Sequence, residues 1–76
     1  MNEILVILKD LHEEYDYENS NDFIEDGYLD SFDMISLVSA LDEKFGISID
    51  GLDILPENFC NINAITDTVR KNGGNI

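Results

Sequence analysis

Apolar residues recur at helical spacing in three parts of the chain. Residues 2–15 and residues 31–45 both place apolar side chains three and four positions apart, the spacing that gathers them on one face of a helix. In the first segment these are Ile4, Leu5, Leu8, Leu11 and Tyr15. In the second they are Met34, Leu37, Val38, Leu41 and Phe45. Gly46 directly after the second segment is a typical helix stop.

A third helix is predicted over residues 61–72. Its inward residues are Ile62, Ile65 and Val69, and Asn61 or Asn63 is the expected N-terminal cap. Pro56 suits the first turn of a short helix that runs through Phe59.

The connecting segments are polar or short. Residues 16–30 are rich in Asn, Asp, Ser and Gly and predict a long loop, which Phe23, Ile24 and Leu29 pin to the core. The apolar triplet 47–49 has no partner strand in the sequence, so we interpret it as a connector. The fold class that follows is all-α: a small four-helix bundle with three main helices, one short helix and a long first loop.

Length and charge narrow the functional classes. A chain of 76 residues is expected to form a single domain over 1–76, with 72–76 frayed. Its 17 acidic and 4 basic residues give a net charge of −13, spread over both halves of the chain. Such a field repels nucleic acid and anionic membrane surfaces, and it attracts proteins that carry basic patches.

Cysteine content and hydropathy exclude further classes. A single cysteine, Cys60, cannot form an internal disulfide or a Cys-rich zinc site, and we expect it to be a small core residue. The apolar run at 4–8 is too short for a signal-peptide core with its flanks or for a membrane span. We therefore expect a cytoplasmic monomer without membrane insertion.

The predicted helix 31–45 has a second face of interest. Phe32 and Ile35 fall outside its main apolar stripe and within one turn of Ser31, among acidic residues. Ser36, Ser39, Asp42 and Glu43 share this side. An apolar spot surrounded by charge is typical of a partner-binding surface, and the alternative is that a loop or the short helix covers it.

Ser31 has three candidate roles at the start of this helix. Asp30 or Ser31 can cap the helix, since both residue types favour that position. A nucleophilic serine needs an adjacent base, and the one histidine, His12, lies on the first predicted helix, with no Gly-x-Ser-x-Gly motif in the chain. The third role is covalent attachment, because a phosphodiester at this position is favoured by the helix dipole and by free backbone N–H groups. Asp30 and Asp33 would oppose that charge unless a metal or a basic partner offsets them.

The stretch "GYLDSFDMISLVSALDEKFGISI" resembles the attachment region of the acyl carrier and peptidyl carrier proteins. Their pattern is Asp-Ser-Leu followed by an amphipathic helix that ends in acidic residues, Phe and Gly. Asp30-Ser31-Phe32-Asp33 matches it, with Phe in place of the usual Leu. The segment "LPENFCNINAI", 55–65, is similar to the tail of many stand-alone carriers, so the resemblance covers most of the chain.

The resemblance implies a four-helix bundle whose Ser31 carries 4′-phosphopantetheine. A phosphopantetheinyl transferase installs this arm from coenzyme A, and Asp30 assists by helping to hold the metal of the bound transferase. The chain itself is then not an enzyme and holds no metal. A loading ligase and downstream enzymes with basic patches use it to carry acyl or aminoacyl groups as thioesters. Its expected partner-binding residues are Phe32, Asp33, Ile35, Ser39, Asp42 and Glu43.

Departures from the family pattern leave alternatives open. Many fatty-acid carriers have Glu where this chain has Ser36, and often Met where it has Ser39. D-alanyl carriers are the nearest rival, but they often have Gly at the position of Asp33 and a Trp-containing stretch that is missing here. We therefore favour a stand-alone carrier of unassigned pathway. An acidic protein-interaction module or nucleic-acid mimic without a covalent arm is the alternative from another class.

Overall fold

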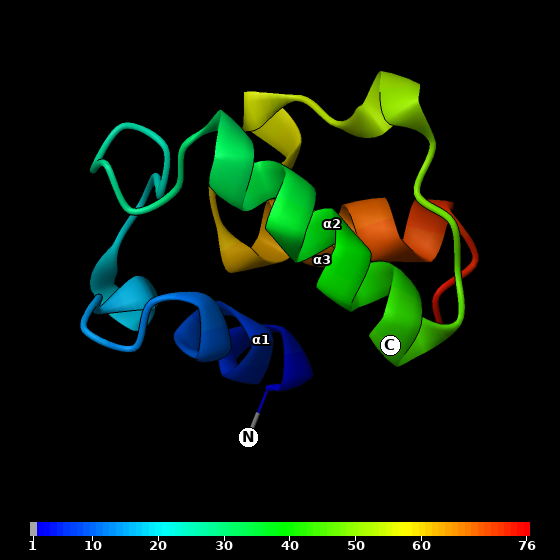
Figure 1. Cartoon of the computed structure of the whole chain (residues 1–76), viewed down its shortest axis with the longest axis horizontal. Coiled ribbons are helices and arrows are strands. Elements are labelled where there is room, and N and C mark those ends of the chain that lie inside the picture. The colour runs from blue at the N-terminus through cyan, green and yellow to red at the C-terminus, as the bar shows by residue number, and fades with distance from the viewer. Residues whose placement is uncertain (1) are drawn as a thin grey trace.

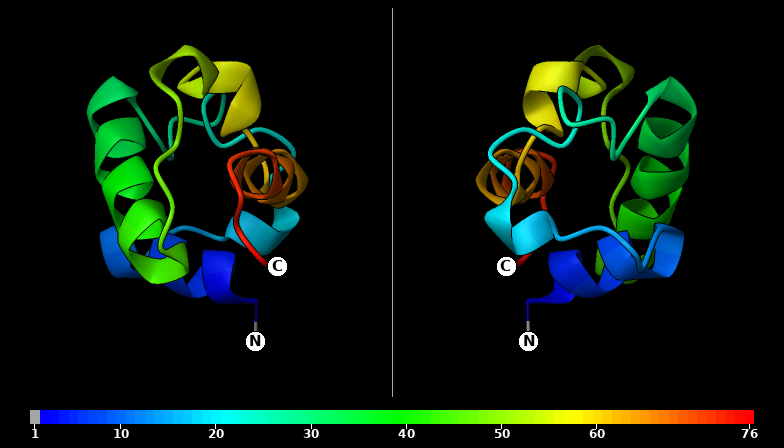
Figure 2. Two further views of the ribbon diagram at one scale, coloured as in Figure 1. Left: turned by 90° about the vertical axis from the view of Figure 1, so that its right-hand side faces the viewer. Right: turned by 90° about the vertical axis from the view of Figure 1, so that its left-hand side faces the viewer.

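A computed structural model describes residues 2–76 of the chain. Three α-helices pack around one core: α1 (Glu3–Leu11), α2 (Ser31–Phe45) and α3 (Ile62–Lys71) (Figure 1). Three single turns of 3₁₀ helix, η1 (Tyr17–Asn19), η2 (Gly51–Asp53) and η3 (Pro56–Asn58), lie in the connections. Two views from the sides show the three α-helices around the common core, with the 46–61 connection passing over one end (Figure 2).

The all-α prediction is confirmed at this coarser level. No strand forms within residues 2–76, and the apolar triplet 47–49 is a connector as expected. The four-helix count is not reached in that part of the chain, because the short helix expected after Pro56 is a single 3₁₀ turn, Pro56–Asn58. None of the helices in residues 2–76 has both the length and the apolar character that a membrane span requires.

The first helix is shorter than predicted. It ends at Leu11 and not near Tyr15, and His12 takes an extended backbone with φ −146° and ψ 96°. Glu13 and Glu14 would place negative charge at the negative end of a longer helix dipole, which is unfavourable. Tyr15 leaves the helical path and stacks on Tyr28, with ring centroids 4.5 Å apart and planes 4° from parallel.

α2 begins and ends where the sequence predicts. Gly46 adopts the left-handed conformation with φ 64°, and its N–H donates to the carbonyl of Asp42. The N–H of Ile47 donates to the same carbonyl over 3.0 Å, which closes the last turn. The connection from α2 to α3 therefore leaves in a fixed direction.

α3 is capped at both ends. The Asn61 side chain accepts from the N–H of Ala64, which decides between the two predicted caps. Gly73 has φ 96°. The N–H groups of Gly73 and Gly74 donate to the carbonyls of Arg70 and Val69 over 3.1 and 2.8 Å. Ile76 packs against the core from the end of the chain. Fraying of 72–76 stays a prediction.

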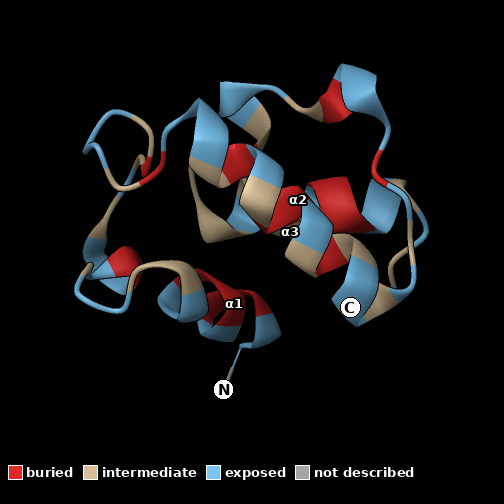
Figure 3. Ribbon diagram, viewed as in Figure 1, coloured by how far each residue is buried: buried red, intermediate tan, exposed pale blue. Residues whose placement is uncertain are grey.

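The core is built from the predicted stripes and from the first loop. Buried positions recur between exposed ones along each helix (Figure 3). Phe23 and Leu29 are buried and Ile24 is half-buried, so the loop is pinned as predicted. Tyr17 is only 1% exposed, although sequence reasoning placed it in a polar loop. Cys60 is half-buried and not a core residue, with Sγ 3.4 Å from the carbonyl oxygen of Glu57.

Candidate functional site

Ser31 is the first residue of α2 and is exposed. Asp30 precedes it with extended backbone and caps the helix, because its Oδ1 accepts from the N–H of Asp33 over 2.8 Å. The Oδ2 of Asp33 in turn accepts from the N–H of Asp30 over 3.2 Å, which completes a capping box. The cap therefore does not use the Ser31 hydroxyl, and the structure decides for Asp30 between the two predicted capping residues.

The first turn of α2 can receive a negatively charged group. The N–H groups of Ser31 and Phe32 have no intrahelical acceptor at this end of the helix, and they lie at the positive end of its dipole. The Asp33 N–H is taken by Asp30. An anion at this position is attracted by the positive end of the helix and repelled by the carboxylates of Asp30 and Asp33. These two effects oppose each other.

His12 is a basic group in direct contact with this turn. Its Nε2 lies 3.1 Å from Oδ1 of Asp33, and its Nδ1 lies 3.8 Å from a carboxylate oxygen of Glu14. The imidazole is one-third exposed. A nucleophilic serine needs a base within hydrogen-bond reach, and the hydrogen bond of this imidazole goes to Asp33.

An aromatic cluster supports the His12 side of the site. It joins the end of α1 to the loop, and its members are His12, Tyr15, Tyr17, Phe23 and Tyr28. The buried Tyr17 hydroxyl donates to the carbonyl of His12 over 3.0 Å. Burial is the main cause that raises the pKa of Tyr17 to about 12, with the negative charge of Glu14 second. Sequence reasoning missed this cluster, although all three tyrosines fall within residues 15–28.

The outer side of α2 carries the exposed apolar residues predicted there. Phe32 is 79% exposed and Ile35 is 66% exposed, so neither a loop nor η3 covers them. Ser39 and Glu43 are exposed on the same helix. Leu52, in η2, is also exposed, and sequence reasoning did not single it out. These residues are accessible to a partner, and partner binding by this face stays a prediction.

Two of the predicted partner-binding acids have intramolecular roles. Asp33 is held in the capping box and against His12. Asp42 is half-buried, and its Oδ1 accepts from the N–H of Ile49 over 2.9 Å. Both carboxylates therefore have hydrogen-bond partners within the chain, whereas Glu43 remains exposed.

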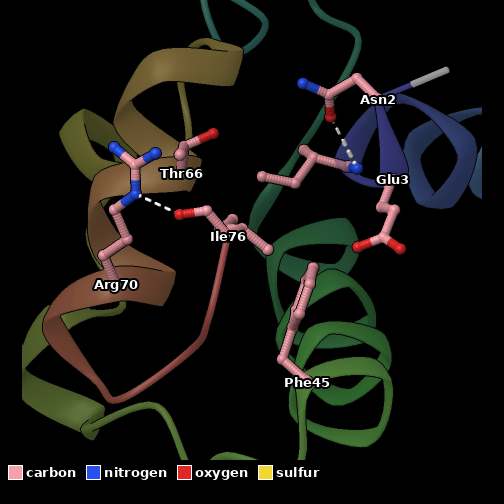
Figure 4. A pocket seen from close by; sticks show the side chains of 7 residues that line it. Asn2, Glu3, Phe45, Thr66, Arg70 and Ile76 are labelled. Atoms are coloured by element: carbon pink, nitrogen blue, oxygen red, sulfur yellow. Dashed lines mark hydrogen bonds between the residues drawn. The ribbon is translucent and has the colours of Figure 1, made fainter.

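One surface hollow lies at the end of α2 that is remote from Ser31. The hollow in Figure 4, about 190 Å³, lies at the opposite end of α2 and is lined by Phe45, Arg70, Ile76 and residues of the first turn of α1. The Nε of Arg70 donates to the carbonyl of Ile76 over 2.6 Å beside it. Within residues 2–76 no group of three or more His, Cys, Asp or Glu side chains is placed to hold a metal ion.

Comparisons of the chain with models of protein families, with characterised proteins and with solved structures found no match.

Proposed function

We propose that the protein is a stand-alone carrier that holds acyl or aminoacyl groups as thioesters on a 4′-phosphopantetheine arm attached to Ser31. The observation that carries the proposal is the exposed Ser31 hydroxyl at the first position of α2, left unused by a cap that Asp30 provides. A serine in this setting can be reached by a modifying enzyme without unfolding of the helix.

The attachment step transfers a phosphoryl-linked group to the serine. The Ser31 oxygen forms a new bond to the phosphorus that bears pantetheine, and the pyrophosphate bond of coenzyme A breaks. Adenosine 3′,5′-bisphosphate leaves, and the hydroxyl proton is lost. The product is a phosphodiester, whose negative charge is favoured by the dipole of α2 and by the N–H groups of its first turn. By the family resemblance, the transferase is expected to bring a metal that Asp30 helps to hold, which would offset the nearby carboxylates.

Two further features support a carrier. The net charge of −13 favours rapid encounter with enzymes that carry basic patches. Phe32 and Ile35 offer an apolar contact within about one helical turn of Ser31. An acidic interaction module would share both features, but it would have no use for an accessible serine at the helix start.

Intact-mass measurement tests the proposal directly. The protein is co-expressed with a broad-specificity phosphopantetheinyl transferase, and we expect the wild type to gain one phosphopantetheinyl group and Ser31→Ala to gain none. Ser48→Ala, an exposed serine in the connection after α2 and outside the predicted partner-binding residues, is the control and should be modified like the wild type. A Ser31→Ala protein that still gains the group would show that the site is wrong. A wild type that never gains it would favour the interaction module.

A further inference from the structure

His12 occupies an unusual electrostatic position. Between Lys9 and Lys44 the sequence has twelve Asp and Glu residues and no Lys or Arg, so His12 is the one basic side chain of that segment. The segment contains the whole first loop and nearly all of α2. The structure places the imidazole on a carboxylate of the first turn of α2, two residues beyond Ser31.

The backbone and ring of His12 are fixed from several directions. Its N–H donates to the carbonyl of Leu8 over 3.0 Å, and its carbonyl accepts from the Tyr17 hydroxyl over 3.0 Å. The Tyr17 hydroxyl is protonated at neutral pH and is the donor in this bond, and the rise of its pKa to about 12 extends this to alkaline pH. The imidazole lies against Tyr15, with ring centroids 5.4 Å apart, and Tyr15 stacks on Tyr28. The end of α1 and the loop thus hold the ring against α2.

The capping box that His12 contacts is doubly acidic. A capping box commonly pairs a Ser or Thr cap with a Glu or Gln three residues later, whereas here both members are Asp. Two carboxylates this close repel one another unless a donor offsets the charge. An ionised carboxylate only accepts hydrogen bonds, so the Nε2 of His12 carries the proton in its contact with Asp33. Glu14 faces the other ring nitrogen, and Tyr15 lies against the ring.

We propose that His12 is a positioning residue for the attachment reaction at Ser31. Its Nε2–H holds the Asp33 carboxylate in the capping box, and the box fixes the Asp30–Ser31–Phe32 backbone that is presented to the transferase. The inference rests on the proposed function and adds to it a link from α1 to the modified serine. Nothing in the α2 sequence alone would provide this link, since its donor comes from the end of another helix.

The role of His12 is tested by measuring how fast a transferase modifies four proteins. These are the wild type, His12→Leu, His12→Gln and Glu14→Gln. With coenzyme A and a phosphopantetheinyl transferase, His12→Leu should lower kcat/KM about tenfold, because it removes a hydrogen bond to a charged group. His12→Gln keeps an amide N–H at similar reach and should recover the rate to within about twofold of the wild type. Glu14→Gln removes the other carboxylate beside the ring and should leave the rate unchanged.

Hydrogen exchange separates positioning from general loss of stability. The N–H of Asp30 donates to Asp33 in the box, so in His12→Leu its exchange should accelerate about tenfold while exchange of the α3 amides stays unchanged. Adding His12→Leu to Asp33→Asn should slow the reaction little further, since both changes break the same contact.

The possible failures are distinguishable. If the wild type is modified and His12→Leu reacts at the same rate, the role of His12 is overturned and the proposed function is not. A rate loss that Gln does not recover, with faster exchange throughout α3, also overturns it and shows a general structural effect. A wild type that no transferase modifies overturns the proposed function and this inference together.

Discussion

At the scale of single residues, Asp53 is a buried charged group outside the site. It is 9% exposed in η2. Its carboxylate accepts from Lys71 Nζ over 2.7 Å and from the Asn72 side chain over 3.2 Å. The Asn72 oxygen accepts from the N–H of Asp50 over 3.0 Å. These contacts tie the connection between α2 and α3 to the last turn of α3.

The ion pair between Asp53 and Lys71 makes the stability of the fold depend on pH. The hydrogen bond from Lys71 is the main cause that lowers the pKa of Asp53 below its ordinary 3.8, and the reciprocal bond raises the pKa of Lys71 above its ordinary 10.5. The Asp53 contribution is therefore fully present above pH 3.8 and is lost as the pH falls through the lower pKa of the folded protein. The Lys71 contribution is present below pH 10.5 and is lost as the pH rises through its higher folded pKa.

We expect Asp53→Asn to melt below the wild type at pH 7, and the difference to shrink as the pH falls below about 3.8. Thermal melts of both proteins between pH 7 and pH 2.5 provide the measurement. Asp67→Asn, an exposed acid of α3, is the control and should show no such convergence. A difference between wild type and Asp53→Asn that stays constant down to pH 2.5 would contradict the ion pair.

At the scale of elements, the two faces of α2 differ in their exposure to solvent. Its inner face places Leu37 and Leu41 in the core with no exposed surface, while its outer face leaves Phe32 and Ile35 in solvent. Ordinary amphipathic helices put polar residues on the outer face. Phe32 and Ile35 are apolar residues on this outer face, and exposed apolar residues of this kind are typical of a surface that a partner covers.

Substitutions on the two faces should separate stability from recognition. Leu37→Ala should cost about 2–5 kcal/mol of unfolding free energy, as core truncations do. Ile35→Ala and Glu43→Lys should change it by no more than about 0.5 kcal/mol, because both residues are exposed. Both exposed changes should nevertheless slow modification or loading, since the apolar contact and the negative charge are lost.

Urea unfolding and modification kinetics on the same samples give the comparison. If Ile35→Ala lost several kcal/mol while Glu43→Lys reacted normally, the outer face would be structural and not a partner surface.

At the scale of the whole molecule, negative charge is unevenly compensated. Lys44 lies 3.9 Å from Glu3 and Lys71 pairs with Asp53, so two basic residues pair with acids away from the first turn of α2. The Ser31 end has His12 beside Asp33. The net charge of −13 leaves most carboxylates of the chain without a basic partner, and their mutual repulsion disfavours the folded state.

We expect the melting temperature to rise with added salt and with divalent cations, because ions screen the repulsion among the carboxylates. Thermal melts across a salt series at pH 7 measure this effect. The same series near pH 4.1, the isoelectric point of the sequence, is the control and should show a much smaller rise. A midpoint that stays flat or falls with salt at pH 7 would show that the repulsion is unimportant for stability.

The sequence by itself determined the features that depend on neighbouring residues. The boundaries of α2 follow from a capping residue at Asp30 or Ser31 and from Gly46 as stop, because both signals act within one turn of the helix ends. The inner stripe of α2 follows from helical period, because a side chain three or four positions along returns to the same face. The position of Ser31 at the start of α2 follows in the same way, whereas its attachment role was inferred from the resemblance to carrier proteins and stays a prediction.

Only the tertiary structure decided the features that depend on distant residues. The early end of α1, the burial of Tyr17 and the contact of His12 with Asp33 all come from packing between segments that the sequence pattern cannot bring together. The sequence pattern also could not decide whether Phe32 and Ile35 are exposed, because that depends on whether the 46–61 connection covers them. Local spacing gives a side chain its face on a helix, but only the arrangement of the other elements decides whether that face meets protein or solvent.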